Sequence, residues 1–166
     1  MSAVAGKNLI YLYRLESEKA TADGTRIALT TEDELSISSD ADATATKDGS
    51  VRGASVAEIE KTMTSLLDKD DPMIPKMKQA ILDGSLIELW EVNLDKPVTG
   101  QTSKFAGTYY QGYLTEYTAS SPADENVEIS MTIGINGKGA DGNVTVPTGQ
   151  QDDGQYTFVD TPKTGV

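Results

Sequence analysis

The chain has 166 residues, of which 37% are hydrophobic and 24% charged, a composition that allows a single folded domain over residues 1–166. Its 26 acidic and 14 basic residues give a formal net charge of -12, which argues against ordinary nucleic-acid binding because phosphates would be repelled. It contains neither cysteine nor histidine, which excludes disulfides, Ser-His-Asp or Cys-His catalysis and the usual zinc, copper and non-haem iron sites.

The N-terminal third is predicted to be β-structure interrupted by polar segments. Residues 1–6 are expected to form a mobile arm before a strand over residues 7–15, which is rich in β-formers. Residues 25–38 alternate loosely and predict one long strand or two shorter ones. Residues 39–50 contain no large apolar side chain and include an Asp48-Gly49 turn signal, so we expect an exposed loop or the tip of a long hairpin.

The middle of the chain changes from a two-residue to a helical period. Residues 57–67 place apolar side chains at alternate positions, which is typical of a strand with one buried face. The following segment predicts a helix over about residues 72–83, because Asp71 is placed to cap it, Pro72 suits its first position and Gly84 suits its end.

The C-terminal half predicts several further strands. Residues 86–94 contain the single tryptophan, Trp90, and residues 105–119 contain Gly107 and Gly112, which indicate bulges or a close approach of two backbones. Residues 127–135 alternate without error and predict the clearest strand. A turn over residues 136–139 and a short strand over 143–146 should follow, before a polar C-terminal arm over residues 150–166 whose β-prone patch is 156–159.

These elements predict a mainly β fold. The expected architecture is a β-sandwich or partial barrel of about seven or eight strands with the helix on its flank. No segment approaches the roughly 20 apolar residues that span a bilayer, and the N-terminus lacks the layout of a signal peptide, so we expect synthesis and folding in a cytoplasm and no membrane contact.

No metal or cofactor site is predicted. The segment from Asp40 superficially resembles a calcium loop, but Ala45 stands where its glycine belongs and Val51 where its closing acid belongs. The acidic run from Glu32 to Glu34 could serve an enzyme that works through paired carboxylates, but a solvated surface explains it more simply.

Four of the seven tyrosines lie within the β-prone stretch over residues 105–119. These side chains could form a platform for sugars or bases, or they could fill the core or a subunit interface, which is the interpretation we favour. The aromatic candidates for core or interface are Trp90, Tyr109, Tyr110, Tyr113 and Tyr117.

Several strings resemble one family in the same order along nearly the whole chain. They are GKNLIYLYRL near the N-terminus, TKDG at 46–49, the helix before Gly84, LIELWEV, and KFAGTYYQGYLTEY followed by SSPADENVEISMTIGINGKG. The chain is similar in these strings to major tail proteins, the tail tube subunits of long, non-contractile-tailed bacteriophages of Gram-positive hosts.

This resemblance implies a non-enzymatic virion subunit that assembles in the host cytoplasm into stacked six-membered rings. The genome would pass through the tube without specific binding, and other tail proteins such as the tape measure and tail terminator would be partners. The exposed loop would contact the next ring through Asp40, Asp42, Thr46, Lys47, Asp48 and Gly49. Acids on predicted strands would line the lumen, with Glu32, Glu34, Glu116 and Glu128 as candidates.

One alternative belongs to a different functional class. A carbohydrate-binding or adhesin-type β-sandwich would use the tyrosines as its ligand surface, and it would be a monomer or small closed oligomer with affinity for glycans.

Overall fold

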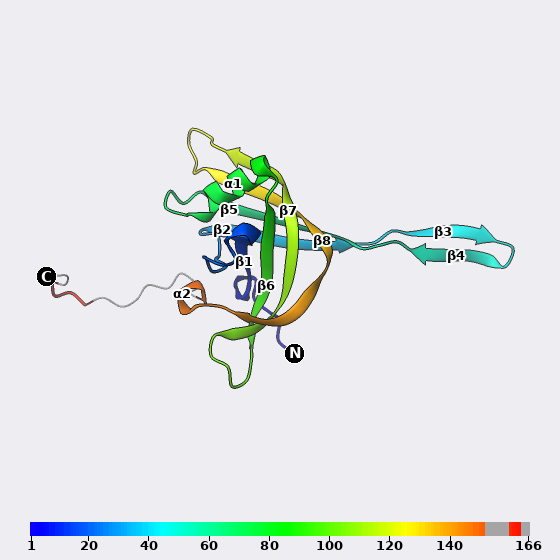
Figure 1. Cartoon of the computed structure of the whole chain (residues 1–166), viewed down its shortest axis with the longest axis horizontal. Coiled ribbons are helices and arrows are strands. Elements are labelled where there is room, and N and C mark those ends of the chain that lie inside the picture. The colour runs from blue at the N-terminus through cyan, green and yellow to red at the C-terminus, as the bar shows by residue number, and fades with distance from the viewer. Residues whose placement is uncertain (152–159, 164–166) are drawn as a thin grey trace.

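The computed structural model describes residues 1–151 and 160–163, and within them the chain is mainly β (Figure 1). A six-stranded antiparallel sheet forms the body and a two-stranded hairpin projects from it. The strands are β1 (Leu9–Leu15), β2 (Thr30–Ser38), β3 (Ala41–Thr46), β4 (Gly49–Ala54), β5 (Glu58–Leu66), β6 (Leu86–Pro97), β7 (Lys104–Ser120) and β8 (Glu128–Thr145). The helices are α1 (Met73–Asp83) and α2 (Thr148–Gln151), with 3-10 turns η1 (Gly6–Asn8) and η2 (Glu16–Glu18).

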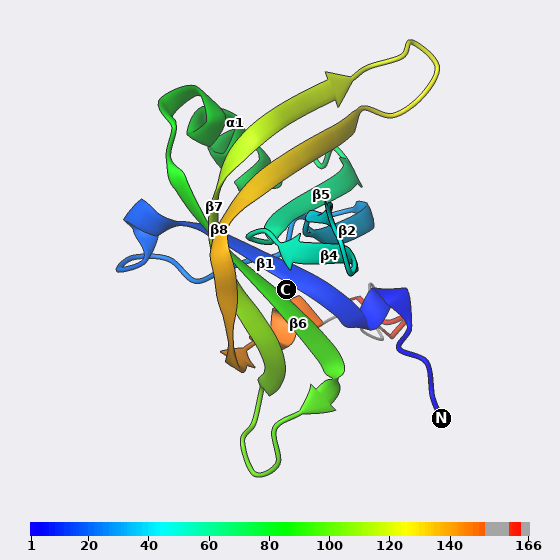
Figure 2. The ribbon, with the colours of Figure 1, turned by 90° about the vertical axis from the view of Figure 1, so that its right-hand side faces the viewer.

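The sheet is continuous, with the order β1-β6-β7-β8-β5-β2. Strands β7 and β8 are 17 and 18 residues long and run through both halves of the body, so the sheet rolls over on itself (Figure 2). One half contains β1 and β6 with the start of β7 and the end of β8. The other contains β2 and β5 with the remainder of both long strands. The predicted mainly β fold is confirmed, and its form is the partial barrel.

Glycines allow the two long strands to approach closely and to bend. A Cβ added at Gly112 would collide with the backbone oxygen of Gly134 on the neighbouring strand. Register shifts lie between Tyr109 and Gln111 and again just after Leu114. The predicted bulges and close backbone approach in this stretch are therefore confirmed.

The predicted turn over residues 136–139 is wrong, because β8 continues through it to Thr145. Tyr109 pairs with Ala140 and Gln111 with Asn136, so β8 advances four residues while β7 advances two. Gly137 and Gly139, with φ of 70° and 76°, supply the left-handed backbone that this wide bulge requires. The glycines that signalled a chain reversal instead absorb extra residues within one strand.

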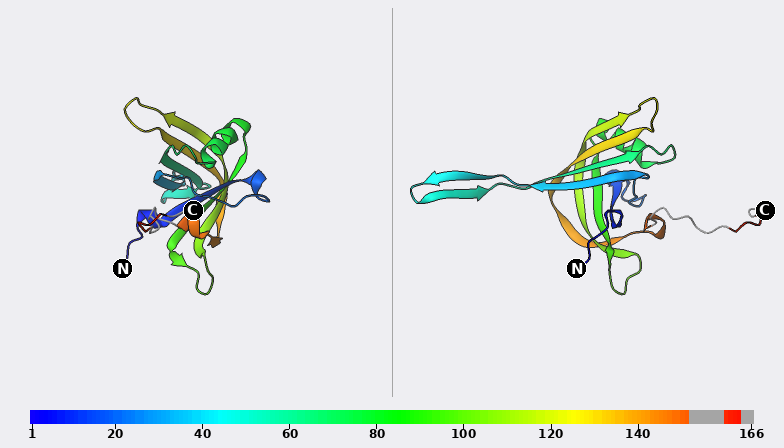
Figure 3. Two further views of the ribbon diagram at one scale, coloured as in Figure 1. Left: turned by 90° about the vertical axis from the view of Figure 1, so that its left-hand side faces the viewer. Right: turned by 180° about the vertical axis from the view of Figure 1, so that it is seen from behind.

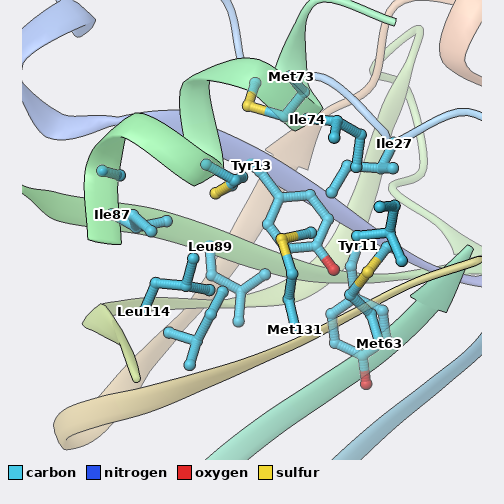
Figure 4. Packing of buried hydrophobic residues seen from close by; sticks show 14 of the residues in the cluster. Tyr11, Tyr13, Ile27, Met63, Met73, Ile74, Ile87, Leu89, Leu114 and Met131 are labelled. Carbon is cyan, nitrogen blue, oxygen red and sulfur yellow. The ribbon is translucent and has the colours of Figure 1, made fainter. Parts of the chain in front are cut away.

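Two clusters of apolar side chains lie on opposite faces of the β1 half of the sheet. Tyr11 and Tyr13 of β1 point into the main core, whereas Ile10 and Leu12 point into the smaller one. The main core is closed by α1 and includes side chains from both halves of the sheet (Figure 4). Both halves consequently depend on the same buried cluster.

Helix α1 forms within one residue of its predicted bounds. The Met73 backbone N–H donates a 2.8 Å hydrogen bond to the Asp71 carboxylate, which also accepts one from the Ala28 N–H. The helix ends at Gly84, whose φ of 68° places it in the left-handed region and whose N–H donates to the Ala80 oxygen. Asp71 thereby joins the helix to the segment that precedes β2.

Two N-terminal predictions need correction. The segment over residues 25–38 becomes a strand only from Thr30, because Thr25 makes an isolated bridge with Tyr13 and Leu29 adopts a left-handed φ of 58°. Residues 39–50 are not a loop, although the alternative of a long hairpin anticipated their form: they comprise β3, a turn at Lys47 and Asp48, and the start of β4.

The N-terminal residues are exposed, and the start of the predicted C-terminal arm is helical. Residues 1–5 lie outside any helix or strand and are exposed, and their mobility stays a prediction. Of the predicted C-terminal arm, Gln150 and Gln151 belong to α2, which was not predicted, while the β-prone patch at 156–159 lies outside the described residues.

The buried tyrosines make the fold sensitive to alkaline pH. Tyr13 is 1% exposed and its hydroxyl has no hydrogen-bond partner among the described residues. Burial, reinforced by the charge of Asp33, raises the pKa of Tyr13 well above its ordinary value. An unfolded tyrosine loses its proton at about pH 10, whereas the folded protein keeps Tyr13 neutral at that pH. Deprotonation in the unfolded state therefore lowers the free energy of unfolding as the pH rises above about 10, and Tyr13 causes no such loss below that pH.

Tyr13→Phe is therefore expected to unfold at similar or higher urea concentrations at pH 7 and to lose less stability between about pH 10 and 11. Urea titrations of both proteins at each pH give the comparison. Both retain Lys61, whose pKa burial lowers, so the difference isolates the tyrosine. An equal alkaline loss in the two proteins would contradict this assignment.

Candidate assembly surfaces

One face of the sheet is largely exposed and carries mainly acids and small side chains, with Leu66 and Tyr113 as its larger apolar members. It spans β2, β5, the first half of β8 and the last part of β7. Strand pairing places its members in rows: Glu34 lies opposite Thr62, which pairs with Thr132. Thr132 in turn pairs with Glu116 of β7. We call the exposed glutamates of this surface the acidic face, and they are Glu32, Glu34, Glu58, Glu60, Glu116 and Glu128.

The structure brings all four predicted lumen acids together on the acidic face, although whether they line a lumen stays a prediction. Glu58 and Glu60 belong to the same face and were not among the candidates. The signal for them was present, since the alternation of β5 puts both opposite its buried side chains. The residues between the acids are mostly small and hydroxylated, such as Ser130 and Thr132. The one lysine of β5, Lys61, lies on the buried side.

The half-sheet that carries the acidic face has an unpaired edge on each side within the described residues. On one side, β2 pairs only with β5. On the other, β6 accompanies β7 only as far as Tyr113, so the residues of β7 beyond Leu114 pair only with β8. Since all four strands alternate in direction, the two free edges run antiparallel to each other. Copies placed side by side could therefore continue the sheet.

The hairpin β3–β4 projects from the body as an extension of β2 and β5 (Figure 1 and Figure 3). Every residue of both strands is exposed. Ser39 and Ser55 close its base, where the Ser39 hydroxyl donates to the Ser55 oxygen at 3.0 Å and the Ser55 N–H donates to the Asp40 oxygen at 2.8 Å. The predicted contact residues Asp40, Asp42, Thr46, Lys47, Asp48 and Gly49 lie along it or at its tip.

Exposed aliphatic side chains occur on the hairpin and at its base. Val51 is 59% exposed, Ile37 at the end of β2 is 61% exposed, and Val56 is 84% exposed. A lone two-stranded hairpin is at best marginally stable in water. A hairpin of this kind would gain stability if a neighbouring copy covered it.

The predicted aromatic candidates separate into different environments. Tyr110 is buried in the main core and Tyr117 packs against it. Trp90 packs against the smaller core, and its ring centroid lies 5.4 Å from that of Tyr109. Tyr113 is 45% exposed. Four of the five are thus core or core-flanking, and Tyr113 alone among them is available to a partner.

The Trp90 ring is already engaged within the chain. The Arg14 guanidinium lies 5.0 Å from its centroid, and a Cβ at Gly24 would lie 2.9 Å from its Cζ3. Glu88 accepts hydrogen bonds from Arg14 Nε at 2.9 Å and from the Tyr109 hydroxyl at 2.5 Å. Burial and this bond raise the pKa of Tyr109. Through these contacts the Trp90–Tyr109 pair packs β1, β6 and β7 together within the subunit.

Within residues 1–151 and 160–163, no group of three or more acidic, histidine or cysteine residues is placed to hold a metal ion. The same part of the chain contains no helix long and apolar enough to cross a membrane.

Comparisons with known proteins agree with this architecture. A family described as phage tail tube protein matches residues 3–141. A putative tail protein of Staphylococcus phage phiMR25 is 30% identical over 158 residues, which cover 93% of this chain and 81% of that protein.

Solved structures share the fold. The SPP1 tail tube protein has a TM-score of 0.78 and 18% identity, covering 99% of this chain and 95% of its own. The tail of an empty gene transfer agent particle, refined with C6 symmetry, has a TM-score of 0.65 and 14% identity, covering 83% of this chain and 98% of its own. The match over residues 3–141 shows that the chain belongs to the phage tail tube protein family, whose members are structural components of the virion.

Proposed function

We propose that six copies of this chain close into a ring and that the rings stack into a tube through which the phage genome passes. The observation that carries the proposal is the half-sheet with antiparallel free edges on both sides, which suits lateral addition of identical copies. The solved tail of a gene transfer agent, refined with C6 symmetry, supports the ring number.

In this arrangement β2 of one copy pairs with the last part of β7 of the next. Each copy then contributes β2, β5, β8 and β7 to one continuous barrel. Closure removes two edges that would otherwise promote uncontrolled aggregation, because the free N–H and C=O groups of β2 and of the last part of β7 find partners in neighbouring copies. The contact is head-to-tail, and it closes because each copy turns by the same angle.

The acidic face is proposed to line the lumen. Its six glutamates per copy, interspersed mostly with small side chains and without lysine or arginine on the same face, would repel DNA phosphates. DNA would then move through the tube without adhering to its wall. An assembled tube with a neutral or basic lumen would contradict this role.

The hairpin β3–β4 is proposed to contact the adjacent ring. It extends beyond the body, and the free hairpin leaves Val51 and the aliphatic side chains at its base in solvent. Residues 1–6 and 150–166 are proposed as further arms for contacts between rings. The tape measure inside the tube and the tail terminator at its end are proposed partners, and assembly would take place in the host cytoplasm without any catalytic role.

Negative-stain electron microscopy of the purified protein tests this function. We expect tubes or rings that increase with protein concentration. A protein that stays monomeric at all concentrations and binds glycans would instead favour the carbohydrate-binding alternative.

A further inference from the structure

The rolled sheet leaves its two edge strands facing each other without pairing. Between β1 and β2 lies a cleft of about 890 Å³, and its lining includes Tyr11 from one edge and Asp33 from the other. Within the described residues the sheet order ends with these strands on opposite sides. Pairing between β1 and β2 therefore does not fix the angle between the two halves of the body.

A buried lysine connects the two edges instead. The side chain of Lys61, on β5, is 0% exposed, and its Nζ donates to Asp33 Oδ1 at 2.7 Å and to the Thr62 oxygen at 2.8 Å. The same Nζ lies 4.1 Å from the centroid of the Tyr11 ring on β1. The Tyr11 hydroxyl donates to Glu91 Oε2 on β6 at 2.6 Å, so the connection continues into the second strand of that half.

This arrangement is a costly way to fill a core position. Removing an ammonium group from water is unfavourable, and replacing a buried ion pair with apolar side chains of similar size is often neutral or stabilising. The apolar alternation of β5, with Ile59 and Met63 on either side, would accommodate such a replacement. The pair is thus poorly explained as a source of stability, whereas directional contacts to both edges fix a geometry.

We propose that Lys61 is a positioning residue for assembly: through Asp33 and Tyr11 it holds the two halves of the subunit at the angle at which β2 meets β7 of the next copy. The inference rests on the proposed closure of the ring through β2 and β7. We call the contacts of Lys61 with Asp33 and with the Tyr11 ring the clasp. Without the clasp, the subunit keeps its core, but its free edge β2 no longer has a single orientation. Rings then close less often and with variable size.

The test compares two charge-matched double variants. Lys61→Met with Asp33→Asn removes the clasp. Lys76→Met with Glu18→Gln removes a surface pair of 3.0 Å that also joins two elements but does not line the cleft between the edges, and it serves as the control. Urea denaturation measures the stability of the folded subunit, and negative-stain class averages measure the number and diameter of the tubes. Lys61→Met with Asp33→Leu repeats the test with an apolar replacement.

We expect both clasp variants to remain folded and the apolar one to unfold at a urea concentration no lower than wild type. Their tube yield should fall at least tenfold, with a broader range of diameters, while the control assembles as wild type does. Folded clasp variants that make wild-type tubes would overturn the proposal. Unfolding of both clasp variants would also overturn it, because the Lys61–Asp33 pair would then be required for the stability of the subunit itself. Wild-type protein that makes no tubes would overturn the ring itself and this inference with it.

Discussion

Deleting residues 40–54 and joining Ser39 directly to Ser55 is expected to leave a folded subunit that no longer grows into tubes. The two ends already lie within hydrogen-bond distance, 3.0 Å from the Ser39 hydroxyl to the Ser55 oxygen, so the new connection needs little rearrangement. All the residues of β3 and β4 are exposed, and the deletion removes no side chain of either core. The free energy of unfolding should change by no more than about 1 kcal/mol.

The effect on assembly should be much larger, because the hairpin is the proposed contact between rings. The critical concentration for tubes should rise at least tenfold, which corresponds to about 1.4 kcal/mol per copy, and isolated rings should accumulate. Light scattering and negative-stain microscopy measure both products. A second variant, Thr44→Gly with Val51→Gly, keeps the chain length while weakening a cross-strand pair of the hairpin, and it should show the same defect. Normal tubes from the deletion variant would remove the hairpin from the ring contact.

Gly112→Val is expected to abolish folding of the subunit. The added side chain would collide with the Gly134 backbone oxygen, and its Cβ would also lie 3.1 Å from the Ile133 Cγ2, so neither β7 nor β8 can keep its position. Both strands pass through the main core and join its two halves, and the expected loss is about 4 kcal/mol or more. Thermal unfolding followed by circular dichroism, together with the soluble yield, measures the effect.

Gly142→Val is the matched control on β8. A Cβ there meets nothing within 4 Å and the backbone φ is not in the left-handed region. The change in Tm should therefore be within a few degrees, since an exposed valine suits a strand. A Gly112→Val protein with the same Tm as the Gly142→Val control would show that β7 and β8 do not approach each other as closely as they do in the structure.

Strands with one buried face could be predicted from the sequence because burial itself imposes the period of two. Ile59 and Met63 in β5 and Ile129, Met131 and Ile133 in β8 are buried as the alternation indicated. The helix was predictable for a similar reason, since its capping acid and terminal glycine act locally. Local signals of this kind do not depend on which strands become neighbours.

The hairpin lacked this signal because neither of its faces is buried. Residues such as Ala43 and Thr44 alternate in direction without alternating in polarity, so the strands could not be distinguished from a loop. The bulge in β8 was mistaken for a turn because positive-φ glycines serve both structures, and only the partner strand β7 decides between them.

The acidic face could be predicted only in part from the sequence, because its rows of side chains depend on the strand order β7-β8-β5-β2. Nothing in the sequence places Glu116 in the same row as Glu34, since the register across four strands sets that relation. The buried Lys61 was missed although it had a signal: the alternation that predicted Ile59 and Met63 as buried puts Lys61 on their face. A charged residue in an apolar row indicates a specific partner, and here the partner is Asp33.

A helical reconstruction by cryo-electron microscopy of tubes grown from the purified protein tests the central claim most directly. We expect six copies in each ring, β2 of each copy hydrogen-bonded antiparallel to the last part of β7 of its neighbour, and Glu32, Glu34, Glu58, Glu60, Glu116 and Glu128 facing the bore. Rings that close through other edges, or a bore lined by a different face of the sheet, would contradict it.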